Sequence, residues 1–233
     1  MIFSRKCALG LIFLLATAAG FAAQAQTGEG AIYGVTNLDV APGATNQAIA
    51  VLKQYRDAAL KQAGNAGVTL LQEVGWPNRF LIYETWNDQT AYDGNEKAAH
   101  TAEFRDRLKT TIAVAPYDRR DYHVITVGPV GAAARSDTIF MQVHLDVFPP
   151  GLAPTLVAVK KVAEAARKGN DNLRYDVVQS VKAPMSHMTL FAAWPSRKAF
   201  DAYEMSDYAR EFRDKVGPLL GSPFDDRLYV LID

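Results

Sequence analysis

Apolar and polar positions along the chain alternate first at strand spacing and then at helix spacing. Residues 31 to 40 alternate with a period of two, which predicts a half-buried strand. Residues 49 to 59 place apolar side chains at helical spacing, which predicts an amphipathic helix. The elements predicted next are a strand over 68–74, a turn around Pro77, a strand over 79–86, a helical region over 88–112 that pauses near Gly94, and a strand over 119–127.

This pattern occurs twice, because residues 31 to 125 align with residues 138 to 232 when one inserted residue is allowed. The matching positions include Leu38-Asp39-Val40 with Leu145-Asp146-Val147, Pro42 with Pro149, Trp86 with Trp194, and Phe104-Arg105-Asp106 with Phe212-Arg213-Asp214. The period is much longer than the ~20 to 50 residues of a solenoid repeat. The chain is therefore predicted to hold a duplicated domain.

Each copy has the order β-α-β-β-α-β, which is that of a ferredoxin-like unit. A four-stranded sheet of this kind has helices on one face and needs a partner for the other. We predict an α+β protein in which two tandem ferredoxin-like halves pack sheet to sheet about a pseudo-twofold axis. The monomer then acts as a pseudo-dimer, and further homo-oligomers stay open.

The N-terminus predicts export. Arg5 and Lys6 precede an apolar run that ends in Ala23-Gln24-Ala25, as in a secretory signal peptide. A membrane-spanning helix is the alternative, but the run is close to the ~17-residue minimum. We expect secretion across the inner membrane, with the mature protein in the periplasm. The predicted divisions are a signal peptide at 1–25, a first domain at 26–127, a linker at 128–137 and a second domain at 138–233.

Composition narrows the range of partners. Cys7 is the only cysteine, so the mature chain has no disulfide. The chain has 25 basic residues (Lys plus Arg) and 25 acidic residues (Asp plus Glu), and its sequence shows no basic stripe. Nucleic acid is therefore not expected as a partner, and neither is a membrane once the signal peptide is cleaved. The four histidines lack metal-ligand spacing, and phosphate-loop and dinucleotide motifs are absent from the sequence. We expect no metal and no cofactor, and a small aromatic ligand.

Glu84 and His100 are the candidate bases. Strand alternation puts Glu84 in a row with Phe80, Ile82 and Trp86, where loss of water raises a carboxyl pKa and suits a general base or acid. The alternative is a structural ion pair with an arginine such as Arg120 across the sheet. His100 heads an apolar helical stripe, where it is either a satisfied core histidine or a proton-transfer group.

Further candidates surround these residues in each copy. Trp86 and Trp194 end their strands before a helix, where an indole either walls a cavity or packs in the core. Catalytic residues are predicted to be Glu84, Trp86, Tyr92 and His100, and ligand-binding residues Asn37, Asn95, Arg105, His144, Trp194, Tyr203 and Tyr208. The first copy is favoured as the active one, because Ala192 and Phe200 replace Glu84 and Tyr92 in the second.

The residues Glu84-Thr-Trp86, Tyr92, His100 and Phe104 resemble the motif of the antibiotic biosynthesis monooxygenase family, and a weaker form recurs at Trp194 and Phe200. The resemblance implies a dimeric α/β barrel and oxidation of quinols or phenols by O2 without metal or flavin. It implies that Trp86, Tyr92 and Arg105 line the pocket. Haem-degrading relatives use an asparagine that Asn37 could match, but their tryptophan and iron-binding histidine are not matched.

Two functions are therefore carried forward. The first is an exported cofactor-independent monooxygenase that oxidises a quinol or phenolic aromatic with O2 in a pocket beside Trp86. A dry cavity with one base, Glu84 or His100, would favour loss of the phenol proton and protect the intermediate from water. The alternative is a non-catalytic protein that binds a small aromatic molecule on the same fold.

Overall fold

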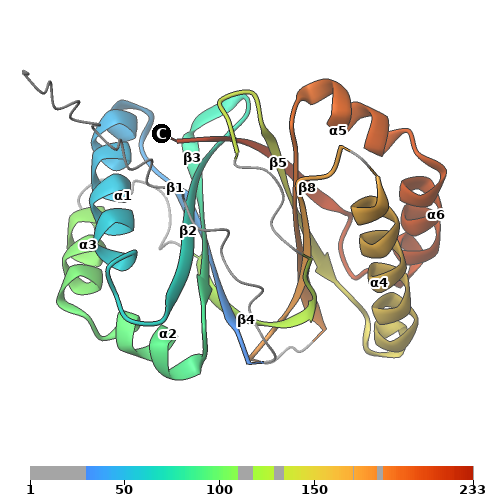
Figure 1. Ribbon diagram of the computed structural model, residues 1–233, viewed down its shortest axis with the longest axis horizontal. Coiled ribbons are helices and arrows are strands. Elements are labelled where there is room, and N and C mark those ends of the chain that lie inside the picture. The colour runs from blue at the N-terminus through green and yellow to red at the C-terminus, as the bar shows by residue number, and fades with distance from the viewer. Residues whose placement is uncertain (1–29, 110–117, 129–133, 170, 183–185, 233) are drawn as a thin grey trace, which may run out of the picture.

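The computed structural model describes residues 30–109, 118–128, 134–169, 171–182 and 186–232 (Figure 1). The first lobe contains β1 (Ile32–Asp39), α1 (Thr45–Ala59), β2 (Asn65–Glu73), β3 (Trp76–Trp86), α2 (Gln89–Glu96), α3 (Ala99–Lys109) and β4 (Asp118–Thr126). The second lobe contains β5 (Ile139–Asp146), α4 (Leu152–Lys168), β6 (Arg174–Ser180), β7 (His187–Trp194), α5 (Arg197–Glu204), α6 (Asp207–Val216) and β8 (Asp225–Leu231). The predicted signal peptide lies outside the described residues.

The strands form one closed antiparallel barrel in the order β1-β3-β2-β8-β5-β7-β6-β4. Two seams join the lobes, β2 with β8 and β4 with β6. Helices α1 to α3 cover one outer side and α4 to α6 the other, so the two sheets face each other across the barrel interior (Figure 1). The predicted pairing of two ferredoxin-like units within one chain is confirmed, and hydrogen bonds at both sheet edges close it.

Local sequence explains where the elements begin and end. Asp88 caps α2, because its carboxylate accepts a hydrogen bond from the backbone N–H of Ala91 at 2.8 Å. Ser196 and Ser206 cap α5 and α6 in the same way. The β2–β3 turn was predicted around Pro77, but it lies at Val74 and Gly75, whose φ of 84° suits glycine.

The interior is divided into three apolar cores. Aromatic side chains fill the barrel, where the rings of Tyr83 and Phe191, one from each lobe, stack with centroids 3.8 Å apart. The other two cores lie between each sheet and its own helices. Among the described residues, the cleft and the groove considered below both lie outside this central core, on the helix side of a sheet or at a lobe edge. Within the described residues, no helix is long and apolar enough to span a membrane.

Candidate functional site

Glu84 lies at the centre of a charged cluster buried between the first sheet and its helices. As predicted, it shares the helix-facing side of β3 with Ile82 and Trp86, and its side chain is wholly buried. The Tyr55 hydroxyl on α1 donates a hydrogen bond to Oε1 of Glu84 at 2.7 Å. On β4, Nη1 of Arg119 is 2.9 Å from Oε2 of Glu84. The buried carboxylate is thus held from a helix and from a strand.

The arginine that pairs with Glu84 is Arg119, whereas Arg120 was the partner considered from the sequence. Consecutive side chains of a strand point to opposite faces of the sheet. Arg120 therefore points away from Glu84, and its guanidinium pairs with Asp118 and contacts His187.

Burial dominates the electrostatics of this cluster. It raises the pKa of Glu84, although the positive charge of Arg119 and the hydrogen bond from Tyr55 act in the opposite direction. Burial also raises the pKa of Tyr55 above its usual value, and the Glu84 carboxylate adds to this increase. The Tyr55 hydroxyl therefore stays protonated and acts as a donor. Arg119 stays charged, because the Glu84 carboxylate and its other neighbours outweigh the effect of burial and raise its pKa.

A hydrogen-bond chain connects His100 to Glu84. Nε2 of His100 is 2.8 Å from Oδ1 of Asn95, and Nδ2 of Asn95 donates to the Tyr55 hydroxyl at 2.9 Å. Tyr55 in turn donates to Glu84. Since the amide oxygen can only accept, His100 is the donor in the first link. The chain brings together three residues predicted from the sequence, Glu84, Asn95 and His100, and burial lowers the pKa of the histidine.

Arg119 also faces a second carboxylate, that of Glu96 on α2, with Nη2 2.7 Å from Oε1. Arg105 on α3, another predicted residue, pairs with the same carboxylate. From the buried interior outwards, negative and positive side chains alternate in the order Glu84, Arg119, Glu96 and Arg105. Arg119 is nearly buried, with 7% of its side chain exposed, whereas Arg105 is half-buried.

A cleft of about 690 Å³ opens over this outer end. Its described lining comes from α2, α3, β4 and the segment after β6, and consists of Gln89, Tyr92, Asp93, Glu96, Arg105, Arg119, Asp121, Val181 and Lys182. Tyr92, Asp121 and Arg119 are the most deeply buried of these, and the guanidinium carbon of Arg119 is 5.5 Å from the centroid of the Tyr92 ring. Burial raises the pKa of Tyr92 to about 12. The most buried groups of the cleft are therefore an arginine cation, an aspartate and a neutral phenol.

Gly34 on β1 makes this arrangement possible. It lies opposite Glu84 in the β1–β3 ladder. A Cβ atom at this position would lie 3.0 Å from Oε2 of Glu84 and 3.2 Å from Cε2 of Tyr92. Because those distances are below ordinary contact, the absence of a side chain gives both groups the space they occupy.

Comparison with known proteins identifies the family of the chain. The profile of the antibiotic biosynthesis monooxygenase family matches residues 31–107 and 138–215, one segment in each lobe. The chain belongs to this family. A search of curated proteins finds no match.

Solved structures share the whole two-lobe fold with this family member. A candidate monooxygenase from Fusobacterium nucleatum subsp. nucleatum is 12% identical, covers 87% of this chain and 93% of its own, and has a TM-score of 0.78. Another, from Lactobacillus acidophilus, is 13% identical, with 87% and 94% covered and a TM-score of 0.70. An anthrone oxidase-like protein is 12% identical, with 88% and 92% covered and a TM-score of 0.71. At these identities the likeness concerns the fold.

The second lobe of this antibiotic biosynthesis monooxygenase family member replaces the charged cluster by aromatic packing. Met141 and Ala192 pair across the ladder where Gly34 and Glu84 pair in the first lobe. The neighbouring Tyr175 shares a hydrogen bond with Tyr203, with hydroxyl oxygens 2.9 Å apart. Three rings in this lobe pack around Trp194, at centroid distances of 4.5 Å for Tyr203, 5.3 Å for Phe200 and 6.4 Å for Tyr175. Side chains thus fill the space beside this indole.

Trp86 is likewise enclosed. Its side chain is wholly buried, and its indole Nε1 has no hydrogen-bond partner among the described residues. It shares the first outer core with Tyr92, which the cleft reaches, but it is not part of the described cleft lining. The cleft is also mostly charged, whereas an apolar cavity was expected. The structure thus places Tyr92 at the cleft and Trp86 behind it.

Other predicted residues lie apart from these clusters. Asn37 and His144 occupy equivalent positions on β1 and β5, and both belong to the alternate set of positions that faces the barrel interior. Oδ1 of Asn37 is buried without a partner among the described residues, whereas Nδ1 of His144 is 3.3 Å from Oγ1 of Thr189. Tyr208 lies on the helix side beside Tyr203, with ring centroids 6.0 Å apart. The structure does not bring Asn37 or His144 to the tryptophans.

Reasoning from the sequence missed Tyr55, Arg119 and Glu96. Tyr55 was read as one of the apolar side chains of an amphipathic helix, and Arg119 as the start of a strand. A signal was present, because Tyr55, Glu84 and Arg119 are all replaced together in the second copy, by Val162, Ala192 and Asp226. Such joint replacement points to residues in contact.

The donor groups of this site do not suggest a metal. Among the residues that the structure describes, no three His, Cys, Asp or Glu side chains are grouped so that they could hold a metal ion. Each carboxylate of the cluster is matched by an arginine or a tyrosine. The arrangement can instead stabilise an oxyanion and donate hydrogen bonds to it.

Proposed function

We propose that this protein is an exported, cofactor-independent monooxygenase that oxidises a small quinol or phenol with O2 at the first-lobe cleft. The observation that carries the proposal is the position of Arg119, at the base of the cleft and paired with the buried Glu84. Membership of the antibiotic biosynthesis monooxygenase family gives the class of reaction. The second lobe lacks both Glu84 and Arg119, so the proposal assigns one active cleft to the chain.

The chemistry balances without a further reductant. A phenol loses its proton, and the phenolate then passes one electron to O2 to give a phenoxyl radical and superoxide. The two radicals join at a ring carbon that carries hydrogen, and the peroxide anion takes back the proton lost by the phenol to form a hydroperoxide. Loss of water from the hydroperoxide leaves a quinone, so one oxygen atom enters the product and the other leaves as water.

Arg119 suits the steps that develop negative charge. A fixed cation in a nearly buried position lowers the energy of a phenolate and of superoxide far more than water-exposed charges do. Tyr92, whose pKa of about 12 keeps it protonated at neutral pH, can donate a hydrogen bond to the same oxygen. We therefore assign charge stabilisation to Arg119 and orientation of the substrate to Tyr92.

We assign the proton of the substrate to Glu84 and a positioning role to His100. The raised pKa of Glu84 suits a base, and the hydrogen-bond chain through Asn95 and Tyr55 orients its carboxylate. Arg119 lies between Glu84 and the cleft, so proton transfer requires its guanidinium to shift towards Glu96, with which it already pairs. Trp86, with its unpaired Nε1, then forms the wall behind the substrate.

The test is O2 consumption with a panel of hydroquinones and polycyclic phenols. Arg119→Met should lower kcat/KM by about 10²-fold, as loss of one charge-stabilising group does. Arg119→Lys keeps the charge and should keep more of the activity. The control is Arg213→Met in the second lobe, which also removes an arginine paired with two carboxylates, although Arg213 is only half-buried, and which should leave the rate within about twofold.

Glu84→Gln, Tyr92→Phe and Trp86→Phe complete the series. Glu84→Gln should lower kcat most at pH values where the wild-type carboxylate is ionised, since that form is the base. Tyr92→Phe should lower the rate by about tenfold through loss of one hydrogen bond. Equal loss of activity in the first-lobe and second-lobe variants would contradict the assignment of the cleft.

The alternative is a non-catalytic protein that binds an aromatic molecule. The complete burial of Glu84 and Trp86 favours it, because neither side chain reaches solvent in this structure. Tight binding of an aromatic compound with no O2 consumption for any member of the panel would support the alternative.

Export is a separate part of the proposal and rests on the N-terminal pattern of residues 1–25. Mass spectrometry of the protein recovered from a periplasmic extract should give a mature N-terminus at Gln26. A cytoplasmic protein that keeps its first 25 residues would contradict this part and leave the cleft chemistry untouched.

A further inference from the structure

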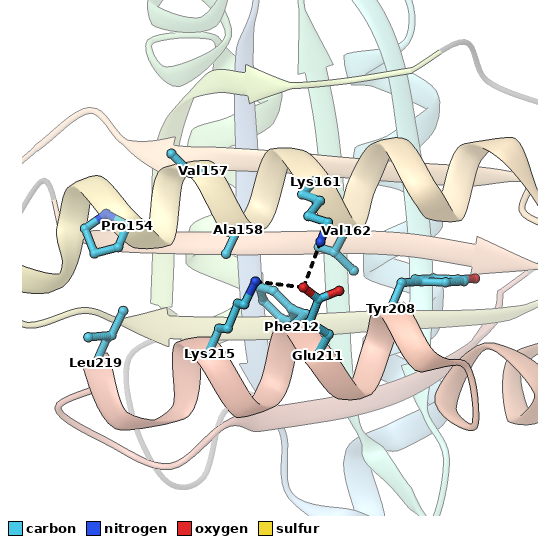
Figure 2. Close-up of a pocket in the computed structure, with 10 residues that line it drawn as sticks. All are labelled: Pro154, Val157, Ala158, Lys161, Val162, Tyr208, Glu211, Phe212, Lys215 and Leu219. Atoms are coloured by element: carbon cyan, nitrogen blue, oxygen red, sulfur yellow. Dashed lines mark hydrogen bonds and ion pairs between the residues drawn. The ribbon is translucent and has the colours of Figure 1, made fainter.

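An apolar groove lies on the outside of the second lobe, between α4 and α6, away from the first-lobe cleft. Figure 2 shows Ala158 and Val162 of α4 facing Phe212 of α6, with Tyr208 at one end and Leu219 at the other. The groove has a volume of about 230 Å³. Its floor and ends are apolar or aromatic, and Lys161 of α4 pairs with Glu211 of α6 across the space between the two helices (Figure 2).

The first lobe explains why the groove exists. At the equivalent position between α1 and α3, the Tyr55 ring stacks on Phe104, with centroids 4.3 Å apart and planes 26° apart. Val162 stands where Tyr55 stands in the first copy, and Ala158 stands where Val51 stands. Both replacements are by smaller side chains. The second lobe therefore keeps the phenylalanine, but among the described residues no ring stacks on it, and its ring neighbour is Phe224, tilted by 60° with centroids 6.0 Å apart.

We propose that this groove binds a small single-ring aromatic acid, whose ring lies on Phe212 as Tyr55 lies on Phe104. The fold already makes this ring-on-ring contact once, in its other copy, so the helix spacing accommodates it. Offset-stacked rings are stabilised beyond the burial of their area. Tyr208 closes the end of the groove with a second aromatic surface.

The size of the groove sets the size of the ligand. An apolar cavity of ~150 Å³ holds one benzene molecule. A groove of about 230 Å³ thus accommodates one ring with one substituent, and it is smaller than the ~300 to 1,000 Å³ of typical drug-sized pockets. Polycyclic phenols, the broader class proposed for the first-lobe cleft, exceed it.

The rim sets the charge of the ligand. Lys161 from α4 and Lys215 from α6 both lie 2.7 Å from the same oxygen of Glu211 (Figure 2). The pKa of Glu211 is lowered to about 2 by the hydrogen bonds from the two lysines, so this carboxylate is ionised at neutral pH. Two ammonium groups then share one carboxylate, which leaves one positive charge over an apolar floor. A ligand carboxylate complements it.

The experiment is a titration of the full mature chain with benzoate, followed by two-dimensional amide NMR. Benzoate should shift the resonances of α4 and α6 at the groove, with a dissociation constant on the order of 1 mM, which is ordinary for a ligand of this size. Cyclohexanecarboxylate has the same charge but no aromatic face, and should bind at least about threefold more weakly. Benzyl alcohol keeps the ring without the charge, and should bind about two- to fivefold more weakly.

Variants locate the site. Ala158→Phe fills the groove and should weaken benzoate binding at least about tenfold, whereas Ala153→Phe, on the exposed side of the same helix, should not. The double variant Lys161→Ala with Lys215→Ala should weaken binding about two- to fivefold, and Lys160→Ala, which is exposed outside the groove, should have no effect. Circular dichroism and thermal unfolding identify any variant that fails to fold.

Three results would overturn the proposal. The first is a folded Ala158→Phe variant that binds benzoate as the wild type does. The second is benzoate shifts confined to the first-lobe cleft. The third is a change of the groove resonances on dilution without benzoate, which would make a second copy of the chain the occupant. None of these results depends on whether the cleft consumes O2.

Discussion

The two lobes have the same scaffold but different interiors between sheet and helices. In the first lobe a glycine makes room for a buried carboxylate, and an arginine and a tyrosine bind that carboxylate. In the second lobe methionine, alanine and tyrosine take the places of Gly34, Glu84 and Val68, and the space is packed with rings. The replacements are coupled, because a buried charge without its partners is strongly unfavourable.

This difference suggests a division of roles. The lobe with the charged cluster has the cleft, and the lobe without it has the apolar groove on its outer side. Both lobes keep the pair Arg105–Glu96 or Arg213–Glu204, so this pair belongs to the scaffold. What distinguishes the first lobe is therefore Arg119 with Glu84.

The largest expected difference between the lobes concerns stability. Arg119→Met leaves Glu84 buried and without its cation, and should lower the free energy of unfolding by about 3 to 5 kcal/mol. Arg213→Met in the second lobe, where 35% of the side chain is exposed, should lower it by about 1 kcal/mol or less. Urea denaturation measures both.

The double variant Glu84→Leu with Arg119→Met sharpens this test. Removing the whole pair should recover at least about 2 kcal/mol of the loss in Arg119→Met, because no buried charge is left unpaired. A double variant less stable than Arg119→Met would show that the pair is not the source of the effect.

The second prediction concerns pH and the position that holds Asn37 in one lobe and His144 in the other. Burial, with His187, Arg120 and Arg227 nearby, lowers the pKa of His144 to about 4, although Asp225 acts in the opposite direction. Below about pH 6.5 the unfolded chain takes up a proton that the folded chain does not. The stability from this group is therefore present above pH 6.5 and lost as the pH falls towards 4.

His144→Asn, which copies the first lobe, tests this. Between pH 7 and 4 the wild type should lose roughly 2 to 3 kcal/mol more of its unfolding free energy than the variant. Parallel loss in both proteins, measured by urea denaturation at each pH, would exclude His144 as the cause.

The third prediction concerns Gly34. Gly34→Ala places a Cβ 3.0 Å from a carboxylate oxygen that Arg119 holds in place, so it should lower the unfolding free energy by about 1 to 3 kcal/mol. Gly43→Ala, where a Cβ meets nothing within 4 Å, should change it by less than about 0.5 kcal/mol. Thermal denaturation compares the two, and equal effects would mean that the space beside Glu84 is not limiting.

The smallest effect is expected at the outer rims. Glu211→Gln removes the exposed ion pairs with Lys161 and Lys215 in the second lobe and should leave the thermal midpoint close to that of the wild type, because exposed ion pairs contribute little to stability. Arg107→Gln, at the equivalent rim of the first lobe, should do the same. A clear fall of the thermal midpoint in either variant would show that these rim residues contribute to the folded core.

The fold could be predicted from the sequence because it depends on patterns that recur along the chain. Alternation in the strands, helical spacing in the helices and the doubled order of elements predicted both lobes and their pairing, and the structure agrees. The turn at Gly75 was misplaced to Pro77, since proline often marks a turn but is also accepted within a strand whose edge is free at that point.

The candidate site could be predicted from the sequence only in part. Alternation placed Glu84 on one face of its strand with Phe80, Ile82 and Trp86, and helical spacing placed His100 inward, but neither says which residues of distant elements meet them. Tyr55 and Arg119 come from elements far from Glu84 in the sequence, and an amphipathic pattern treats a tyrosine as one more apolar side chain. The complete burial of Trp86 could not be predicted either, because it depends on how α2 packs on the sheet.

Both seams of the barrel lie within one polypeptide, through β2 with β8 and β4 with β6. In a dimer of identical chains every amino-acid change appears twice, so a carboxylate gained on one side is also gained on the other. Joining the halves covalently removes that constraint and makes the pairing insensitive to dilution. One half is then free to keep a charged interior while the other changes independently.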